Sequence, residues 1–294
     1  MFSILIPSFN NLNYLKTCIE SIKKNSHYNH QIIVHVNEGS DGTLDFIKKK
    51  QIDFTHSTNN IGMPRALNTS SKKAKFEYIL ISHDDFYYCP GWDQILFEEI
   101  KTIKHNNFYI SGTMVGEGQV KFNAGSEIYN FNEKKLLENL NEIYTFDFQG
   151  TTKCPGLIHK DIWHRVGGWS EEFSPTGGDD TDFAMKLWMS DVRIFKGLGK
   201  SLAYHFGSIT TRKKDKNLFT YLGSRGNKIF LKKWGISINF FENHYLQSGL
   251  DNNKKLIFNK YEGPLKNPKI SFKYLFEFLK CKIQLIYLII VRYK

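Results

Sequence analysis

Two adjacent carboxylates follow an apolar segment in the stretch ISHDDFYYCPGW, residues 81–92. Asp84 and Asp85 carry like charges, so each must stay hydrated or meet a cation. A hard divalent cation is bound by one or two carboxylates together with the phosphate oxygens of a substrate. The pair therefore indicates either a metal site that receives a diphosphate or a turn capped by aspartate.

A second group of acids lies in GGDDTDF, residues 177–183. The two glycines let a substrate approach the backbone closely. A carboxylate can act as a general base toward a hydroxyl group within hydrogen-bond reach. Acidic residues are also favoured in the first turn of a helix by the helix dipole, and that explanation fully accounts for Asp182.

Helices and strands must position these acids. Over the first 115 or so residues, the spacing of the apolar residues alternates between that of a strand and that of a helix. This alternation predicts a parallel sheet with helices on both faces, which binds ligands beyond the carboxyl ends of its strands. The loops PSFN, NEGSDG, STNNIG and SHDD should therefore meet at one edge. The predicted strands are 2–8, 31–36, 52–57, 77–82 and 108–115, and the predicted helices are 13–24, 43–49, 64–74 and 93–104.

The rest of the chain is less regular. Residues 116–154 show no clear pattern, and order returns with a helix predicted over LIHKDIWHRVGGW (157–169). TGGDDTDFAMKLWMSD (176–191) predicts a turn that feeds a helix. VRIF (192–195) and LAYHF (202–206) predict two strands.

Composition limits the classes of function. The chain has 294 residues, is 41% hydrophobic and 23% charged, and carries a net charge of +11. It shows no zinc-finger spacing and no RNA-recognition signature, so we expect a phosphate-rich ligand or an anionic membrane rather than nucleic acid. Four cysteines without a CxxC pair indicate a reducing compartment, and the first residues predict a strand rather than a signal peptide.

The C-terminal residues 270–294 are apolar and aromatic, with lysines at intervals. Their uninterrupted apolar part, residues 283–291, is shorter than the roughly 20 residues that a membrane-spanning helix needs. A basic, aromatic helix of this kind can lie among the headgroups of an anionic membrane, or it can dock on the protein's own core. Upstream, Arg212, Lys213 and Lys214 either close over a diphosphate or form a solvated face.

Six segments, taken in order, resemble family 2 of the inverting glycosyltransferases, which have the GT-A fold. They are IPSFN, VHVNEGSDGT, NNIGMPRALNTS, ILISHDDFYYCPGW, VGGWSEEF with GGDDTDF, and YHFGSIT. The resemblance covers residues 2–210 and implies an α/β fold of GT-A type, with a Rossmann-like, mostly parallel sheet flanked by helices. It implies a glycosyltransferase domain at 1–210, with a nucleotide-sugar half (1–115) and an acceptor and catalytic-base half (116–210), before a basic, helical C-terminal region at 211–294.

The resemblance implies a binding site for a nucleoside diphosphate sugar. Asn37 stands where the family usually has an aspartate that binds uracil, and because an amide both donates and accepts, the choice of base stays open. Arg65 could also face a phosphate. The residues that match this site are Pro7, Phe9, Asn10, Asn37, Glu38, Asp41, Asn60, Gly62, Arg65, His83 and Asp84.

The family's DxD motif aligns with residues 83–85, which puts Asp85 at the position that binds Mn²⁺ or Mg²⁺ and His83 in place of the first acid. His205 matches a histidine that completes the metal site in many relatives, although a lone histidine is as often structural.

In the second half of the resemblance, Asp180 matches the catalytic base and Asp179 a second acid beside the acceptor. Trp169 lies in the acceptor region, where its ring could stack on a sugar or belong to the core.

The implied activity is inverting transfer of a hexosyl or other sugar, most often from a UDP-sugar, to a hydroxyl of a glycan or lipid-linked acceptor. Such a reaction would serve the synthesis of cell-surface polysaccharide or glycoconjugate, in the cytoplasm or on the inner face of the cell membrane. A nucleotidyltransferase of sugar phosphates is disfavoured, because PSFNNLNYL lacks the glycine-rich loop of that class. A non-catalytic relative that binds a glycan or a membrane partner stays open, because Asn37 and His83 depart from the family pattern.

Overall fold

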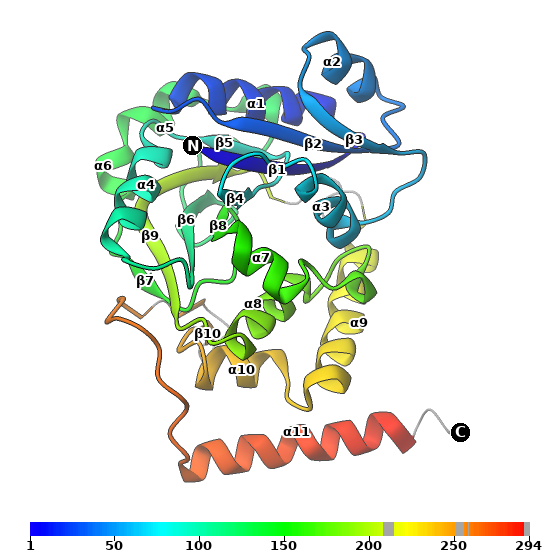
Figure 1. The fold of residues 1–294 in the computed structure, drawn as a ribbon, viewed down its shortest axis with the longest axis vertical. Helices are drawn as coiled ribbons and strands as arrows, with labels where there is room; N and C mark the ends of the chain where they lie inside the picture. Colours follow the sequence, from blue (N-terminus) through cyan, green and yellow to red (C-terminus); the bar gives the residue numbers. More distant parts are fainter. Residues whose placement is uncertain (208–214, 251–255, 258, 291–294) are drawn as a thin grey trace.

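The sheet at the centre of the computed structural model has nine strands, with helices on both of its faces (Figure 1). The structure describes residues 1–207, 215–250, 256–257 and 259–290. The strand order is β3-β2-β1-β4-β8-β6-β9-β5, and β7 pairs with β9. The strands are β1 (Phe2–Phe9), β2 (Gln31–Asn37), β3 (Asp53–Ser57), β4 (Tyr78–Ile81), β5 (Phe86–Tyr88), β6 (Phe108–Gly116), β7 (Phe148–Gln149), β8 (Gly156–His159) and β9 (Ile194–His205), and a separate pair is formed by β10 (Gly249–Leu250) and β11 (Leu256–Ile257).

Helix α1 lies on one face of the sheet, and α3 and α7 lie on the other (Figure 1). The α-helices are α1 (Leu12–Asn25), α2 (Thr43–Lys49), α3 (Met63–Ser71), α4 (Trp92–Thr102), α5 (Glu133–Glu138), α6 (Leu140–Ile143), α7 (Lys160–Val166), α8 (Asp179–Met189), α9 (Lys216–Trp234), α10 (Ile238–His244) and α11 (Phe272–Ile290).

The first half of the sheet is parallel. Strands β1 to β4 pair in parallel, and Phe9 at the end of β1 lies opposite Asn37 at the end of β2. Every residue of β2 is buried, as expected of an apolar strand covered by helices on both faces. The strands and helices predicted for residues 2–115 are all present, and the predicted α/β fold class is confirmed. Their loops meet at one edge of the sheet.

The second half of the sheet is mixed. Strand β8 lies between β4 and β6 and is antiparallel to both, and β5 is antiparallel to β9. The helix predicted over 157–169 is therefore wrong at its beginning, because its first residues belong to β8 and α7 begins at Lys160. A buried strand of four residues is too short for apolar periodicity to distinguish it from a helix.

The two strands predicted at 192–195 and 202–206 are one strand, β9. The glycines between them are sites of close approach. A Cβ atom on Gly197 would lie 2.0 Å from the ring of Phe148, and one on Gly199 would lie 2.1 Å from the carbonyl oxygen of Thr145. Glycine inside a strand often marks such an approach rather than a break.

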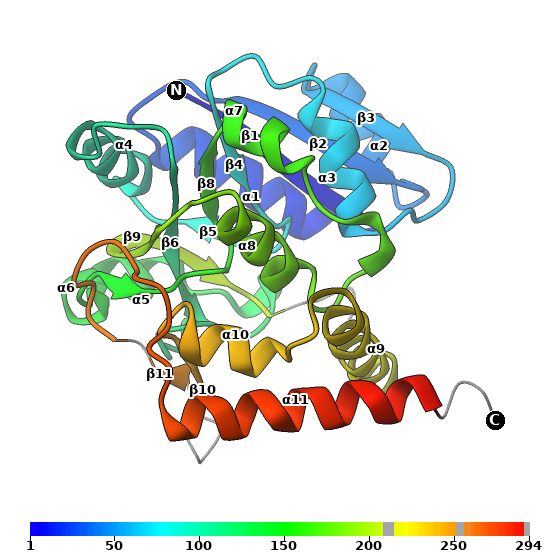
Figure 2. The same cartoon turned by 60° about the horizontal axis from the view of Figure 1, so that its bottom comes forward.

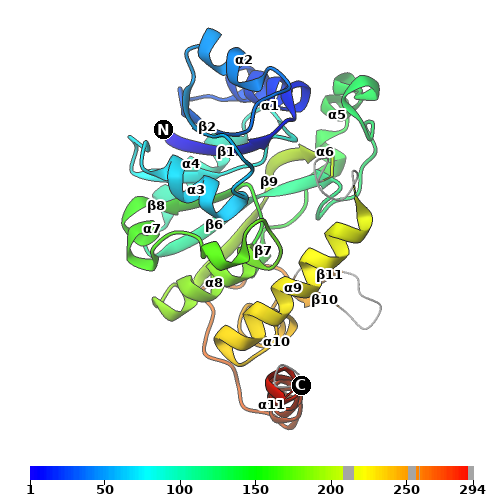
Figure 3. The same cartoon turned by 90° about the vertical axis from the view of Figure 1, so that its right-hand side faces the viewer.

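Helices α9 and α10 pack against α8, and their buried residues Phe230 and Phe241 belong to the main core. Asp182 of α8 is fully buried, and it accepts a hydrogen bond from Trp234 Nε1 at 2.7 Å and lies 3.0 Å from Lys233 Nζ. The division of the chain at residue 210 stays a prediction, but these contacts join the C-terminal helices to the body of the fold. Figure 3 shows α11 end-on beneath α10. Among the described residues, no helix has both the length and the apolarity to cross a bilayer.

Helix α9 crosses the turn before α8 at a glycine, and this crossing is testable. A Cβ atom on Gly226 would lie 1.9 Å from the carbonyl oxygen of Gly177, whereas one on Gly223 would meet nothing within 4 Å. Gly223→Ala should therefore raise the free energy of unfolding by about 0.5–1 kcal/mol, the ordinary gain in a helix. Gly226→Ala should lower it by about 1–3 kcal/mol through overpacking. Urea unfolding of both variants measures the difference, and equal stabilisation would contradict the close crossing.

Candidate active site

A cavity of about 270 Å³ opens at the edge of the sheet where β1, β2 and β4 end. It brings together most of the predicted nucleotide-sugar residues with the predicted metal ligand Asp85. It is lined by Pro7, Ser8, Phe9, Asn37, Asn60, Gly62, Met63, His83, Asp84, Asp85, Pro175, Thr176, Leu218 and Leu222.

One wall of the cavity is closed by a backbone contact between the start of α3 and the turn before α8. The Met63 amide donates to the carbonyl oxygen of Pro175 at 2.9 Å. Gly62 has a φ of +81°, and a Cβ atom there would lie 2.5 Å from Pro175 Cα, so only glycine fits. Asn37 Oδ1 accepts from the Ile61 amide at 2.9 Å and holds this loop beside β2.

Two predicted binding residues hold the neighbouring loops together instead of lining the cavity. Asn10 Nδ2 donates to Glu38 Oε2 at 3.0 Å, and Asn10 Oδ1 accepts from the Gly39 amide at 3.1 Å. These bonds tie the end of β1 to the end of β2, so Asn10 and Glu38 shape the rim of the cavity.

Two further predicted residues point elsewhere. Asp41 is exposed and accepts from the backbone amides of Leu12 at 2.8 Å and Thr43 at 3.1 Å, so it caps α1 and α2. The Nε atom of Arg65 lies 3.4 Å from Glu171 Oε2 on the exposed surface. The expectation that Arg65 could face a phosphate stays a prediction, and in this structure its guanidinium pairs with the acid of the neighbouring turn.

The metal-ligand candidates are brought together by the pairing of β5 with β9. Phe86 lies opposite His205 in this antiparallel pair, and the Phe206 amide donates to the carbonyl oxygen of Asp85 at 3.2 Å. This register brings His205 Nε2 to 3.4 Å from Asp85 Oδ2. His83 Nδ1 lies 3.9 Å from Asp85 Oδ1, and the ligand atoms of the three residues all lie within 4.8 Å of one another.

Hydrogen bonding fixes the orientation of His205. Its Nδ1 atom lies 2.6 Å from the carbonyl oxygen of Glu117, which can only accept, so Nδ1 carries the proton. Nε2 then faces Asp85, the orientation that a metal-binding imidazole needs. Burial lowers the pKa of His83 to about 4, so this imidazole is neutral at pH 7. Two imidazole nitrogens and a carboxylate form a donor set that suits Mn²⁺ better than Mg²⁺.

The second carboxylate of the adjacent pair has a different partner. Asp84 Oδ2 accepts from the Ser8 hydroxyl at 2.7 Å. Burial, together with the charge of Asp85, raises the pKa of Asp84 to about 7. In the absence of a cation, the pair therefore avoids two full negative charges near neutral pH.

The predicted base, Asp180, forms an ion pair that the sequence did not reveal. Lys153 Nζ contacts Asp180 Oδ2, and the Thr181 amide donates to Asp180 Oδ1 at 2.8 Å. Burial alone would raise the pKa of Asp180, but the ammonium of Lys153 holds it below its usual value. The charges of Asp180 and Lys153 also act on the pKa of His83, so both lie within electrostatic reach of the metal-ligand cluster.

Two residues predicted for the acceptor region are engaged elsewhere. Asp179 accepts from the Gly177 amide at 2.9 Å and from the Thr176 hydroxyl, so it caps its own turn. The ring of Trp169 is 2% exposed and stacks on Phe183 with a centroid distance of 5.6 Å. The expectation that Trp169 stacks on a sugar is corrected, because a ring buried on both sides has no face left for a ligand.

Several site residues had no usable signal in the sequence. Lys153 lies in the irregular segment before β8. Leu218 and Leu222 of α9 line the cavity, and Glu242 of α10 lies 3.2 Å from the Thr181 hydroxyl beside the predicted base. These three lie in the region that was expected to be an extension. The basic residues 212–214 fall outside the described part of the chain.

The fold and the site define a class, that of the GT-A sugar transferases. S. aureus TarS 1–349, solved in complex with UDP, superposes with a TM-score of 0.53 at 14% identity, over 82% of this chain and 72% of that one. The mannosyltransferase PcManGT from Pyrobaculum calidifontis, solved with GDP-Man and Mn²⁺, gives 0.50 at 14% identity, over 69% and 56%. At such identities the likeness shows the fold alone.

The model of glycosyl transferase family 2 matches residues 3–160, just over half of the 294 residues, and the chain belongs to this family. A hyaluronan synthase from Pasteurella multocida is 25% identical over 279 residues, 88% of this chain and 26% of the synthase. An uncharacterized glycosyltransferase from Rickettsia bellii is 32% identical over 117 residues, 38% of this chain and 16% of that protein. The chain thus spans only about a quarter or less of the length of these relatives.

The ion pair of Asp180 predicts a pH-dependent effect on stability. In the Lys153→Met variant no ammonium group offsets the effect of burial on Asp180, so the pKa of Asp180 should rise. Ionised Asp180 then destabilises the variant at pH 7, and protonation relieves this as the pH falls. The stability difference from wild type should therefore be largest near pH 7 and shrink toward pH 4. Urea unfolding between these values measures it.

The control for this experiment is Lys24→Met, which breaks the exposed ion pair with Glu133, where the lysine side chain is 59% accessible. Its effect should stay below about 1 kcal/mol at every pH. A Lys153→Met difference that does not vary with pH would show that Asp180 is not held ionised by this lysine.

Proposed function

We propose that the protein transfers a sugar from a nucleoside diphosphate sugar to a hydroxyl group, with inversion at the anomeric carbon. The observation that supports this most is the convergence of three features: a cavity lined by His83 and Asp85, His205 beside these two residues, and Asp180 within electrostatic reach of the cluster. The proposed donor is a UDP-sugar, supported by family membership and by the UDP complex of TarS.

The proposed metal is Mn²⁺, with Mg²⁺ as the other candidate. Asp85 and His205 would hold it, with His83 as a third ligand, because their donor atoms already converge. PcManGT, which has a similar fold, was solved with Mn²⁺. When bound, the ion would stabilise the negative charge that builds up on the departing diphosphate.

The proposed base is Asp180. Its carboxylate would take the proton of the acceptor hydroxyl while that oxygen attacks the anomeric carbon and the nucleoside diphosphate leaves. Asp180 Oδ1 accepts from the amide and the hydroxyl of Thr181, whereas Oδ2 contacts Lys153 and keeps a second lone pair for the acceptor. Lys153 keeps Asp180 ionised at neutral pH, at the cost of lower basicity.

The proposed acceptor is a hydroxyl of a glycan or of a lipid-linked saccharide, in the synthesis of cell-surface polysaccharide or glycoconjugate. The hyaluronan synthase among the relatives supports a polysaccharide product. We place the protein in the cytoplasm, at the inner face of the cell membrane. The nucleotide-sugar half at 1–115 and the acceptor half at 116–210 belong to the same proposal.

The second candidate is a non-catalytic relative that binds a glycan or a membrane partner. The ion pair between Lys153 and Asp180 favours it, because a carboxylate paired with an ammonium is a weaker base than a free one. The two candidates share the fold and differ in whether Asp180 is needed for turnover.

Donor binding can be tested by thermal unfolding with UDP, GDP, dTDP or CMP, each with and without Mn²⁺. A ligand at 100 times its dissociation constant should stabilise the protein by about 2.7 kcal/mol. We expect this stabilisation with UDP and Mn²⁺ together, and its loss in Asp85→Ala. The matched control is Asp45→Ala, which removes an exposed aspartate of α2 outside the cavity. The absence of any nucleotide effect on wild type would overturn the donor site.

The role of Asp180 can be tested with Asp180→Asn. Loss of a general base should lower kcat about 10²- to 10⁴-fold. Nucleotide binding, measured by the same thermal shift, should change only a few-fold, because the carboxylate acts on the acceptor. Transfer at a near wild-type rate would show that another group accepts the proton.

A further inference from the structure

Helix α11 is attached to the protein by one face only. The ring of Tyr274 lies 5.0 Å from that of Phe240, and Glu277 Oε2 lies 2.6 Å from His244 Nε2. Cys281 is buried and accepts from the Ser237 amide at 3.3 Å. Figure 2 shows the helix lying lengthwise along the edge of the molecule, below α10 and α9.

The opposite face of α11 is apolar and uncovered. At 100° per residue its side chains span an arc of roughly 120°, which is wide for a solvent-exposed surface. We call this the outer face. It consists of Phe272, Leu275, Phe276, Leu279, Ile283, Ile286, Tyr287 and Ile290, each between 51% and 86% exposed.

Positive charge borders the outer face along one side. At the same helical spacing, Lys273 and Lys280 lie along this border, whereas Lys282 on the other side donates to the carbonyl oxygen of Gly235 at 3.0 Å and so faces the protein. Glu277, the single acid of α11, faces inward to His244. The whole chain carries a net charge of +11. An apolar arc with the ammonium groups of Lys273 and Lys280 along its border complements a surface that is apolar in depth and anionic at its boundary.

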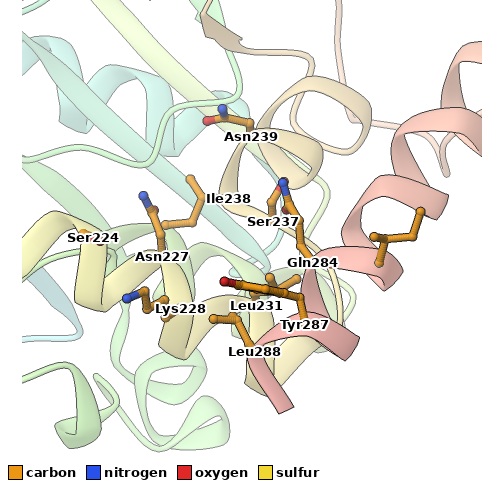
Figure 4. Close-up of a pocket in the computed structure, with 11 residues that line it drawn as sticks. Ser224, Asn227, Lys228, Leu231, Ser237, Ile238, Asn239, Gln284, Tyr287 and Leu288 are labelled. Atoms are coloured by element: carbon orange, nitrogen blue, oxygen red, sulfur yellow. The ribbon is translucent and has the colours of Figure 1, made fainter. Parts of the chain in front are cut away.

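A cavity of about 560 Å³ lies at the edge of the outer face, between α9, α10 and the second half of α11 (Figure 4). Ile283 and Tyr287 belong both to this cavity and to the outer face. On the α9 side, Lys228 and Asn227 add polar groups to the cavity wall. The uncovered apolar surface is therefore continuous with a recess that offers a cation and amide groups.

We propose that α11 is an in-plane anchor, whose outer face enters the apolar boundary of an anionic phospholipid bilayer while the bordering lysines meet the headgroup phosphates. Lying in the plane keeps Lys273 and Lys280 at headgroup depth, whereas a crossing helix would carry Lys280 into the hydrocarbon. A second copy packed on the outer face would add its own Lys273 and Lys280 to the same border and bring like charges together. The inference specifies the membrane contact of the proposed function and needs neither donor nor metal.

The test is co-sedimentation of the full chain with phosphatidylcholine vesicles that contain or lack 30% phosphatidylglycerol. We expect binding to the anionic vesicles that weakens with salt. The double substitution Leu279→Asp with Ile283→Asp should lower the partition coefficient more than tenfold. Each of Lys273→Gln and Lys280→Gln should lower it about fivefold. Matched controls are Met189→Asp and Lys134→Gln, which change exposed residues on α8 and α5 and should have no effect.

A second variant keeps the test independent of folding defects. The tryptophan introduced by Phe276→Trp should fluoresce at a shorter wavelength when the variant binds anionic vesicles. Brominated acyl chains in those vesicles should quench this fluorescence. Equal binding to neutral and anionic vesicles, unchanged binding of the double variant, or no quenching would overturn the proposal. A dimer of the wild type that the double substitution converts to a monomer, as measured by light scattering, would also overturn the proposal if the wild type does not bind vesicles. Transfer to a water-soluble acceptor without lipid should be unchanged in all variants, so failure of the anchor and failure of the enzyme are distinguishable.

Discussion

The pairing of β5 with β9 is the constraint on which the candidate active site depends. Its register sets Phe86 opposite His205 and thereby brings Asp85 and His205 together. β9 also runs beside β6, and the carbonyl oxygen of Glu117, just after β6, fixes the imidazole of His205. Asp85 lies in the turn between β4 and β5, where its carbonyl oxygen accepts from the Phe206 amide, so backbone hydrogen bonds between segments distant in sequence position Asp85 and His205.

Helices α9 and α10 complete the candidate active site that forms at the edge of the sheet. Without α9, the cavity would lack the wall formed by Leu218 and Leu222. Without α10, the pair of Lys153 and Asp180 would lack the neighbouring carboxylate of Glu242, whose charge helps to raise the pKa of Lys153. The chemistry proposed for the first 210 residues thus relies on side chains that follow residue 210. Helix α8 carries Asp180 and also packs against α9 and α10, so the stability of these helices and the geometry of the site are coupled.

The sequence predicted the elements whose pattern is local. The parallel strands and their helices followed from apolar periodicity, and the loops at their ends supplied most of the cavity. What it missed depends on long-range pairing. Strand β8 is too short for its apolar residues to show a recognisable periodicity. Lys153 and Asp180 form an ion pair but belong to no shared sequence motif. For Trp169 the sequence left both alternatives open, because a tryptophan that stacks on a sugar and one in the core look alike in sequence, and the structure buries it in the core.

Leu218 and Leu222 lie one turn apart on α9 and border the cavity, yet they belong to no strand of the sheet. Substitutions there change the size of the cavity while the register that assembles His83, Asp85 and His205 stays intact. Under the proposed function, the shape of one cavity wall could therefore change without altering the strand pairing that assembles the proposed metal ligands. In evolutionary terms, a lineage could then diverge in ligand preference through one helix while it retains the sheet.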